Sequence, residues 1–272
     1  MSYKIIASDL DGTLLDSNSE VSCENLKAIE KLANLGVFFV PSTGRTFNEI
    51  PEKIRNNENV RYYICANGST VYDKKTGKSI KRCISNEVGK KVLGIVSEYE
   101  IHTSYRKDGS CYVDSRFQTD EAWEYYNVCL AHQVVVRNFS IHLDDFESSL
   151  ATADEVEVYS FFFKNAEDQL ECKARLRGIS EIAVAEVTEY NIEVFNAEAG
   201  KGKALYALAD MLGVDRKETM ALGDSNNDAS IILAAGLGLA MENACDSLKE
   251  IADDVICRND EHVAEFVLKN YF

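Results

Sequence analysis

Short apolar runs alternate with amphipathic stretches in the first quarter of the chain. The runs at residues 3–7, 37–40 and 62–66 are rich in β-branched and aromatic side chains, which is typical of buried strands. The stretches between them, residues 22–35 and 48–56, carry apolar residues at helical spacing. Strand, helix, strand, helix, strand is the order that builds a parallel sheet with helices packed on its faces. The pattern therefore predicts an α/β fold.

The same alternation returns near the end of the chain. We expect the apolar run 192–195 to resume the first domain, followed by a helix over 201–212. Strands follow at 219–222 and 237–241 with a helix between them, and a final strand and helix begin at Val255. The fold class that these elements predict is α/β, with a Rossmann-like parallel sheet as the core and helices on both faces.

The rhythm changes between these two parts. The segments 70–72 and 79–83 flank a glycine-containing turn and predict a hairpin. Beyond it, helical and strand patterns are mixed without regular alternation, as in α+β arrangements. We expect helices at 87–100, 120–132 and 167–177, and strands at 102–107, 111–116, 156–163 and 182–189. The sequence thus predicts a core of residues 1–82 and 190–272, interrupted by an inserted α+β cap at 83–189. The run Phe161-Phe162-Phe163 is expected to be sheet core.

Composition and charge restrict the function. The 272 residues carry a formal net charge of −16, which argues against a nucleic-acid partner and against an anionic membrane surface. A phosphorylated metabolite is not excluded, because a local cation and a few basic residues can overcome a distant field. No apolar stretch approaches the length of a membrane span, and we expect no secretory signal, so we expect a cytoplasmic protein with reduced cysteines. The eight cysteines include no Cys-x-x-Cys pair and the four histidines show no metal-site spacing, so we expect no structural zinc.

Polar clusters follow four of the predicted strands. Asp9 and Asp11 end the first, within Asp-Leu-Asp-Gly-Thr, which would rarely arise by chance. The others are Thr43-Gly44-Arg45, Asn67-Gly68 and the acidic stretch 224–228, while Lys201 opens a predicted helix. Because the carboxyl ends of parallel strands meet at one edge of a sheet, we expect these clusters to converge there.

The four motifs Asp-Leu-Asp-Gly-Thr-Leu, Thr-Gly-Arg, Lys-Gly and Gly-Asp-Ser-Asn-Asn-Asp occur in an order and at distances that resemble the haloacid dehalogenase-like superfamily. More narrowly, the chain resembles the Cof-like branch, subfamily IIB, over nearly its whole length. The resemblance implies a Mg²⁺-dependent phosphatase that hydrolyses a small phosphorylated metabolite, such as a sugar phosphate, through an aspartyl-phosphate intermediate.

The resemblance also implies roles for individual residues. Asp9 would be the nucleophile and Asp11 the general acid and base. The Mg²⁺ ligands would be the side chain of Asp9, the backbone carbonyl of Asp11, and Asp224. The residues that bind the phosphoryl group would be Leu10, Thr43, Gly44, Lys201 and Asn227. The supporting residues would be Asp228, Arg45 and Asn67.

Several assignments have alternatives. Lys203 competes with Lys201, and Ser42 with Thr43. Arg45 would contact the substrate, the cap or an acidic neighbour, and Asn67 would either support the site or only form a turn. In the cap, the segment 105–116 combines basic and aromatic residues that would either recognise the substrate or form a solvated hairpin.

The function itself also has alternatives. One is a phosphomutase of the same superfamily, which returns the phosphoryl group to a sugar. Another is a non-catalytic ligand-binding regulatory protein. The sequence predicts neither the substrate nor the oligomeric state.

Overall fold

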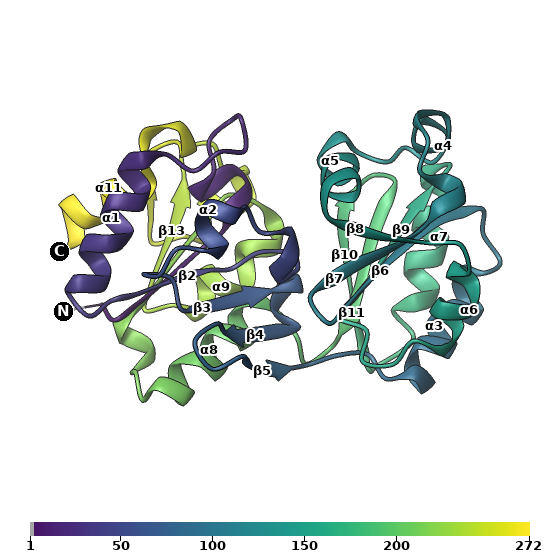
Figure 1. Ribbon diagram of the computed structural model, residues 1–272, viewed down its shortest axis with the longest axis horizontal. Helices are drawn as coiled ribbons and strands as arrows, with labels where there is room; N and C mark the ends of the chain where they lie inside the picture. The colour runs from purple at the N-terminus through teal and green to yellow at the C-terminus, as the bar shows by residue number, and fades with distance from the viewer. Residues whose placement is uncertain (1–2) are drawn as a thin grey trace. The chain divides into compact units, whose positions relative to one another are not determined.

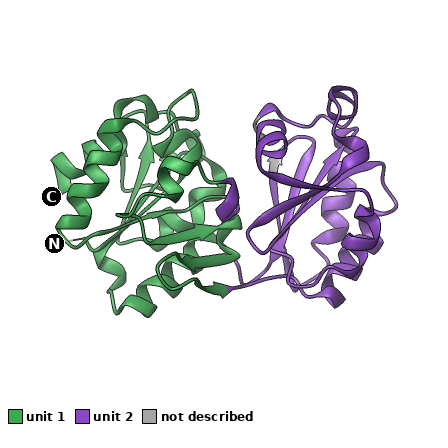
Figure 2. Ribbon diagram, viewed as in Figure 1, with its two compact units in different colours: residues 1–45, 50–80, 200–272 green, residues 46–49, 81–199 purple. Residues whose placement is uncertain are grey.

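The computed structural model describes residues 3–272, and the side chains of all of these except residues 131 and 187. Its chain divides into two compact units. Unit 1 comprises the residues up to Arg45, Ile50–Ile80 and Gly200–Phe272, and unit 2 comprises Thr46–Glu49 and Lys81–Ala199 (Figure 2). No helix in the described part of the chain is long and apolar enough to cross a membrane.

Unit 1 is built on a parallel sheet with the strand order β14-β13-β12-β1-β2. Its strands are β1 (Ile5–Ser8), β2 (Phe38–Pro41), β12 (Thr219–Gly223), β13 (Leu237–Met241) and β14 (Asp254–Ile256). The interior strand β1, between β12 and β2, is fully buried, as its apolar run predicts. The predicted fold class is confirmed, because the elements form a parallel sheet with connecting helices (Figure 1).

The helices of unit 1 cover both faces of this sheet. They are α1 (Cys23–Asn34), α2 (Glu52–Arg55), α8 (Lys201–Leu212), α9 (Ala229–Ala234), α10 (Asp246–Lys249) and α11 (Val263–Tyr271). The crossovers β1–α1–β2 and β12–α9–β13 run in opposite directions across the sheet. Such crossovers are right-handed, so α1 and α9 lie on opposite faces. Helix α11 packs beside α1, and α8 beside α9 (Figure 1).

A small sheet continues unit 1 beyond β2. It has the order β3-β4-β5, with β3 (Tyr62–Cys65), β4 (Thr70–Asp73) and β5 (Lys78–Lys81). Strand β3 meets the large sheet through one parallel bridge between Ser42 and Ile64 and otherwise pairs antiparallel with β4. The predicted hairpin is present as the neighbouring strands β4 and β5. The predicted helix over 48–56 is reduced to a 3₁₀ turn and α2, because Pro51 interrupts it.

Unit 2 contains a six-stranded sheet with the order β10-β11-β9-β6-β7-β8, in which only β7 and β8 are parallel neighbours. Its strands are β6 (Ile101–Lys107), β7 (Ser110–Asp114), β8 (Ser140–Leu143), β9 (Val158–Phe163), β10 (Ile182–Thr188) and β11 (Asn191–Asn196). Its helices are α3 (Asn86–Val96), α4 (Asp120–Tyr125), α5 (Leu130–Phe139), α6 (Phe146–Thr152) and α7 (Ala166–Leu176).

Strand β9 shows how unit 2 buries both faces of its sheet. Phe161 and Phe163 lie in the larger apolar cluster, which α3, α6 and α7 help to form. Phe162 points the other way, into a second cluster with Trp123 of α4 and Val136 of α5. Alternate side chains of a strand face opposite sides, so all three phenylalanines are core, as predicted.

Two sequence predictions for unit 2 are wrong. The run 192–195 does not resume the first sheet, because it forms β11, which pairs with β9 and β10. The single helix predicted over 120–132 is two helices, α4 and α5. Asn127, between them, adopts a left-handed backbone conformation with φ 53° that a continuing helix does not allow.

Candidate active site

Two neighbouring parallel strands deliver acidic residues to the same edge of the unit 1 sheet. Strand β1 ends at Ser8, which pairs with Leu222 of β12, and the amide of Asp9 donates to the carbonyl of Leu222 over 2.9 Å. Asp224 follows β12 directly. Carboxylate oxygens of Asp9, Asp224 and Asp228 lie within 4.8 Å of one another. The strand ends thus bring together acidic groups separated by more than two hundred residues.

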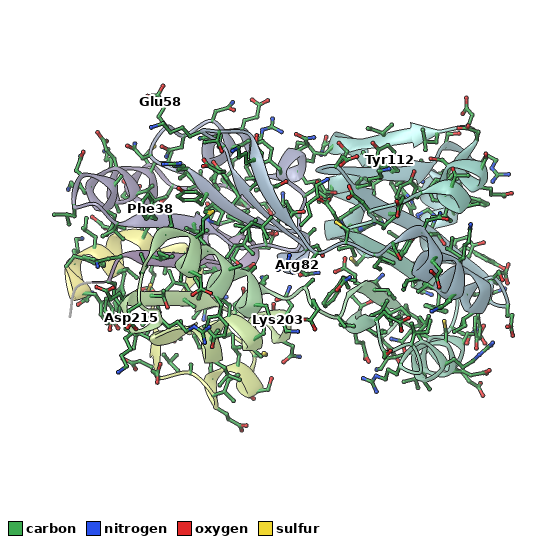
Figure 3. All side chains as sticks on the ribbon, turned by 90° about the horizontal axis from the view of Figure 1, so that it is seen from below. Phe38, Glu58, Arg82, Tyr112, Lys203 and Asp215 are labelled. Carbon is green, nitrogen blue, oxygen red and sulfur yellow. The ribbon has the colours of Figure 1, made fainter. Side chains whose placement is uncertain are left out.

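Lys201 lies at the centre of this acidic group. Its Nζ donates to Asp9 Oδ1 over 2.7 Å and to Asp228 Oδ1 over 2.6 Å. Lysine and both carboxylates are buried, with Lys201 only 1% exposed. Burial alone would lower the pKa of Lys201, but the carboxylates of Asp228 and Asp9 raise it above its ordinary value. Lys201 is therefore charged, and of the two predicted candidates it is the one at the site; Lys203, labelled in Figure 3, is exposed.

Asp228 shapes the turn after β12. Its Oδ2 accepts from the backbone amides of Asp224 and Ser225 over 3.0 and 3.1 Å. A side chain at Gly223 would strike the Asp228 carboxylate, so only glycine fits there. This arrangement fixes the backbone that carries Asp224. Burial, then the neighbouring Asp228, raise the pKa of Asp224 to about 6.

Thr13 has a role that sequence reasoning missed. Its Oγ1 donates to Asp224 Oδ1 over 2.9 Å, so the turn after β1 holds the acidic residue that follows β12. The threonine stands within the first motif, and a buried hydroxyl there needs a partner. The motif was therefore a signal for such a contact, but the partner is 211 positions away in the sequence.

The segments around Thr43 and Asn67 are tied to each other and to Lys201. The amide of Thr43 donates to the carbonyl of Ile64, and the amide of Asn67 donates to the carbonyl of Thr43, over 2.9 and 3.1 Å. Gly68, with φ +90°, lies so close to Gly200 that a Cβ would come within 2.3 Å of its carbonyl. Asn67 therefore supplies a turn that connects the Thr43 loop to the start of α8.

The hydroxyls of Ser42 and Thr43 differ in their surroundings. Thr43 Oγ1 accepts from the amide of Arg45 over 3.1 Å. Within the described part of the chain, the buried Ser42 Oγ has no hydrogen-bond partner. That Thr43, and not Ser42, supplies the hydroxyl that binds the phosphoryl group therefore stays a prediction.

Arg45 forms an ion pair with Asp11. Nη2 donates to Oδ1 over 2.6 Å and Nε to Oδ2 over 2.9 Å. Of the predicted alternatives for Arg45, the structure contains the acidic neighbour. Asn227, by contrast, is exposed, and its Oδ1 accepts from Ser225. Leu10, which lies between Asp9 and Asp11 in the sequence, has a fully buried side chain.

Arg106 and Arg116, which the sequence offered as substrate contacts, are both paired within unit 2. Arg106 is 5% exposed and donates to Glu193 and Ser160, each over 3.0 Å, with Glu49 at 3.4 Å. Arg116 donates to Asp114 and Glu147. Arg106 is therefore part of a buried ionic group rather than a solvated hairpin.

The chemistry of the acidic group suits a hard divalent cation. Carboxylate oxygens are the ligands that Mg²⁺ prefers, and three of them gather around one point. The buried Asp9 carries a pKa that burial raises well above its ordinary value, against the lowering effect of Lys201. A cation here would offset the repulsion among these carboxylates.

Known proteins identify this arrangement. The model of the haloacid dehalogenase-like hydrolases matches residues 6–267. The chain belongs to this family. Phosphatase YwpJ of Bacillus subtilis is 30% identical over 98% of this chain and 99% of its own length. The 5-amino-6-(5-phospho-D-ribitylamino)uracil phosphatase YwtE of the same organism is 29% identical over 97% and 96%.

Solved structures of haloacid dehalogenase-like hydrolases share the fold. One from B. subtilis superimposes with a TM-score of 0.82 at 26% identity, covering 99% of this chain and 100% of the other. The predicted resemblance is therefore confirmed. The curated relatives are phosphatases, and this haloacid dehalogenase-like hydrolase is a phosphatase.

Proposed function

We propose that this phosphatase hydrolyses a small phosphorylated metabolite, of the sugar or sugar-alcohol phosphate class, through an aspartyl-phosphate on Asp9 with Mg²⁺ as cofactor. The observation that carries the proposal is the buried Lys201, which bridges Asp9 and Asp228 beside Asp224. In this proposal unit 1 is the catalytic core and unit 2 the inserted cap. Residues 190–199, which the sequence pattern assigns to the core, lie in unit 2 because β11 pairs with β9 and β10.

The chain's own residues perform two displacements. A carboxylate oxygen of Asp9 attacks phosphorus, the P–O bond to the substrate alcohol breaks, and the departing oxygen takes a proton from the Asp11 carboxyl. Asp11 then removes a proton from water, whose oxygen attacks phosphorus and releases phosphate from Asp9. Lys201, Thr43, the amides of Leu10 and Gly44, and Asn227 bind the phosphoryl oxygens as their charge redistributes.

Asp9, Asp224 and the backbone carbonyl of Asp11 would hold the cation, and Asp228 would orient Lys201. When bound, Mg²⁺ lowers the repulsion between an anionic nucleophile and an anionic phosphate ester. Asp11 has its carboxylate turned to Arg45, which agrees with its backbone rather than its side chain being the ligand. Arg45 orients the acid-base carboxylate, and Asn67 holds the Thr43 loop.

The substrate class rests on the relatives. YwtE is named for a phosphorylated ribityl compound, in which phosphate esterifies a sugar alcohol. Such an alkoxide leaves poorly without a proton, and the exposed Asp11 carboxyl suits its protonation. The net charge of −16 disfavours polyanionic partners such as nucleic acid.

The test is phosphate release from a panel of sugar and sugar-alcohol phosphates, with Mg²⁺ and with excess chelator. We expect Mg²⁺-dependent release from some of the panel, and none from Asp9→Asn. In Asp11→Asn, p-nitrophenyl phosphate should give a stoichiometric burst of nitrophenolate and then slow turnover, because the second step lacks its base. Mass spectrometry should locate the added phosphate on Asp9. Transfer to a sugar instead of water, stimulated by a sugar bisphosphate, would identify a phosphomutase and overturn the hydrolase.

A further inference from the structure

Three asparagine side chains bind backbone carbonyls of the turn that follows β1. Asn243 Nδ2 donates to the carbonyl of Gly12 over 2.8 Å, Asn25 Nδ2 to that of Leu14 over 3.2 Å, and Asn259 Nδ2 to that of Leu15 over 3.1 Å. This turn carries Asp9 and Asp11. The three asparagines lie on separate segments of unit 1, and none has a role in the reaction as proposed above.

Asn243 differs from the other two in its position. It lies in the turn after β13, and both ends of its amide are used, because its Oδ1 accepts from the backbone amide of Asn259 over 3.0 Å. The amide donates to one backbone segment through its nitrogen and accepts from another through its oxygen, so one side chain binds both segments. Asn243 thus joins the turn after β1 to the C-terminal segment.

The Gly12 carbonyl that Asn243 binds belongs to a residue that is next to Asp11 in the sequence and close to Asp224 in space. Gly12 follows Asp11, and its backbone, with φ +78°, lies against Asp224 so closely that a Cβ would come 2.6 Å from Asp224 Oδ2. Thr13, on the other side of the same carbonyl, donates to Asp224 Oδ1. The bound carbonyl belongs to the peptide that joins Gly12 to Thr13. Rotation of this peptide would therefore disturb the contacts of Gly12 and Thr13 with Asp224, and with them the turn that also carries Asp11.

We propose that Asn243 is a positioning residue for phosphoryl transfer, which holds the Gly12 peptide so that Asp11 and Asp224 keep their mutual placement. The inference rests on the proposed function. Asn25 and Asn259 bind the turn two and three residues further on, away from the reacting groups. They stabilise the fold of the turn without setting the position of Asp11.

The test compares matched variants in the full chain. Asn243→Asp keeps the acceptor for the Asn259 amide and loses the donor to Gly12, while Asn259→Asp loses the donor to Leu15 and adds the same charge. We expect kcat to fall about 10²-fold in Asn243→Asp, as small misplacements of reacting groups can cause, with little change in KM. Asn259→Asp should keep kcat within about threefold of the wild type, even if its melting temperature falls as much as that of Asn243→Asp.

A second readout does not depend on turnover. Calorimetric titration with Mg²⁺ alone, without substrate, should give weaker binding to Asn243→Ala than to Asn259→Ala or the wild type. The inference would be overturned if the variants at Asn243 and those at Asn259 lost kcat and Mg²⁺ affinity equally. It would also be overturned if the variants at neither position lost any. If the wild type releases no phosphate from any ester, the proposed function fails instead, and the two failures are distinguishable.

Discussion

Arg45 holds both carboxylate oxygens of Asp11, at 2.6 Å through Nη2 and 2.9 Å through Nε. The Asp11 side chain is half exposed and Arg45 mostly buried, so the arginine is the fixed partner and the carboxylate the oriented one. A planar guanidinium can bind both oxygens at once, which a lysine ammonium cannot do in the same geometry. The ion pair therefore sets the direction in which Asp11 presents its acid-base group.

Arg45→Lys should slow proton transfer more than phosphorus attack. We expect the single-turnover rate with an alkyl phosphate to fall roughly tenfold, a part of what a general acid contributes, and less with p-nitrophenyl phosphate, whose leaving group needs no proton. Arg61→Lys is the matched control, because Arg61 binds Asp73 through the same two nitrogens at 2.8 and 3.0 Å. Equal slowing with both esters would show that Arg45 acts on the phosphoryl group and not through Asp11.

The convergence of Asp9, Lys201 and Asp224 could be expected from the sequence, because all three lie where strands end or helices begin. A parallel sheet collects such positions at one edge, whatever the details of packing. The placement of Asn67 follows from this rule only through the single parallel bridge between Ser42 and Ile64, because β3 otherwise pairs antiparallel with β4. The pairing of Arg45 with Asp11 was one of several alternatives, since a long side chain can reach several partners from one backbone position.

Other features depend on contacts that local pattern does not encode. Strand β11 has the apolar run of a core strand, but its sheet is decided by pairing with β9 some thirty residues earlier. Strand β8 and helix α6 lie in a polar stretch without clear periodicity, and the sequence did not predict them. Asn243 reaches Gly12 across 231 positions, and a single asparagine in a turn gives no sign of such a partner.

Gly68→Ala should disturb both stability and activity. Two costs add, because φ +90° is strained for alanine and the new Cβ would come within 2.3 Å of the Gly200 carbonyl. Gly77→Ala is the control, because its φ is +71° but nothing lies within 4 Å of the new Cβ. In urea unfolding, we expect the free energy of unfolding to fall by about 1 kcal/mol in Gly77→Ala and by more in Gly68→Ala.

The activity of the same two variants separates strain from position. Gly200 precedes Lys201, so a displaced Gly200 moves the lysine, and we expect kcat to fall at least tenfold in Gly68→Ala only. Wild-type kcat in Gly68→Ala would show that the contact with Gly200 is structural alone.

His102 should make the stability of unit 2 sensitive to acid. Burial lowers the pKa of His102 to about 4, although Asp114 opposes this effect. An unfolded histidine titrates near 6.5, so between pH 6.5 and 4 the unfolded chain binds a proton that the native protein does not. The free energy of unfolding therefore falls as the pH is lowered through this window, by roughly 3 kcal/mol from this residue.

His102→Phe keeps an aromatic ring among Phe117, Tyr126 and Phe162 and removes the titrating group. Chemical denaturation at several pH values should give a shallower acid slope for this variant than for the wild type. An identical slope in His102→Phe and the wild type would contradict the prediction.

Lys201→Met should leave the acidic group without its cation. Asp9 and Asp228 would remain buried with their shared partner removed, and breaking a buried ion pair in this way typically costs about 3–5 kcal/mol. We expect a loss of this size in the free energy of unfolding, and no measurable phosphatase activity. Lys203→Met, a neighbouring exposed lysine, should be close to wild type in both measurements.

The pH dependence of the same variant tests the cause. Burial already raises the pKa of Asp9 and Lys201 opposes that rise, so without Lys201 the native protein takes up a proton at Asp9 more readily than the unfolded chain does. The stability deficit of Lys201→Met should therefore shrink as the pH is lowered from 7 to 5. Adding Asp228→Asn to Lys201→Met removes one of the stranded charges and should restore part of the stability while the enzyme stays inactive. A deficit that is independent of pH and unrelieved by Asp228→Asn would assign the loss to packing of the lysine stem instead of its charge.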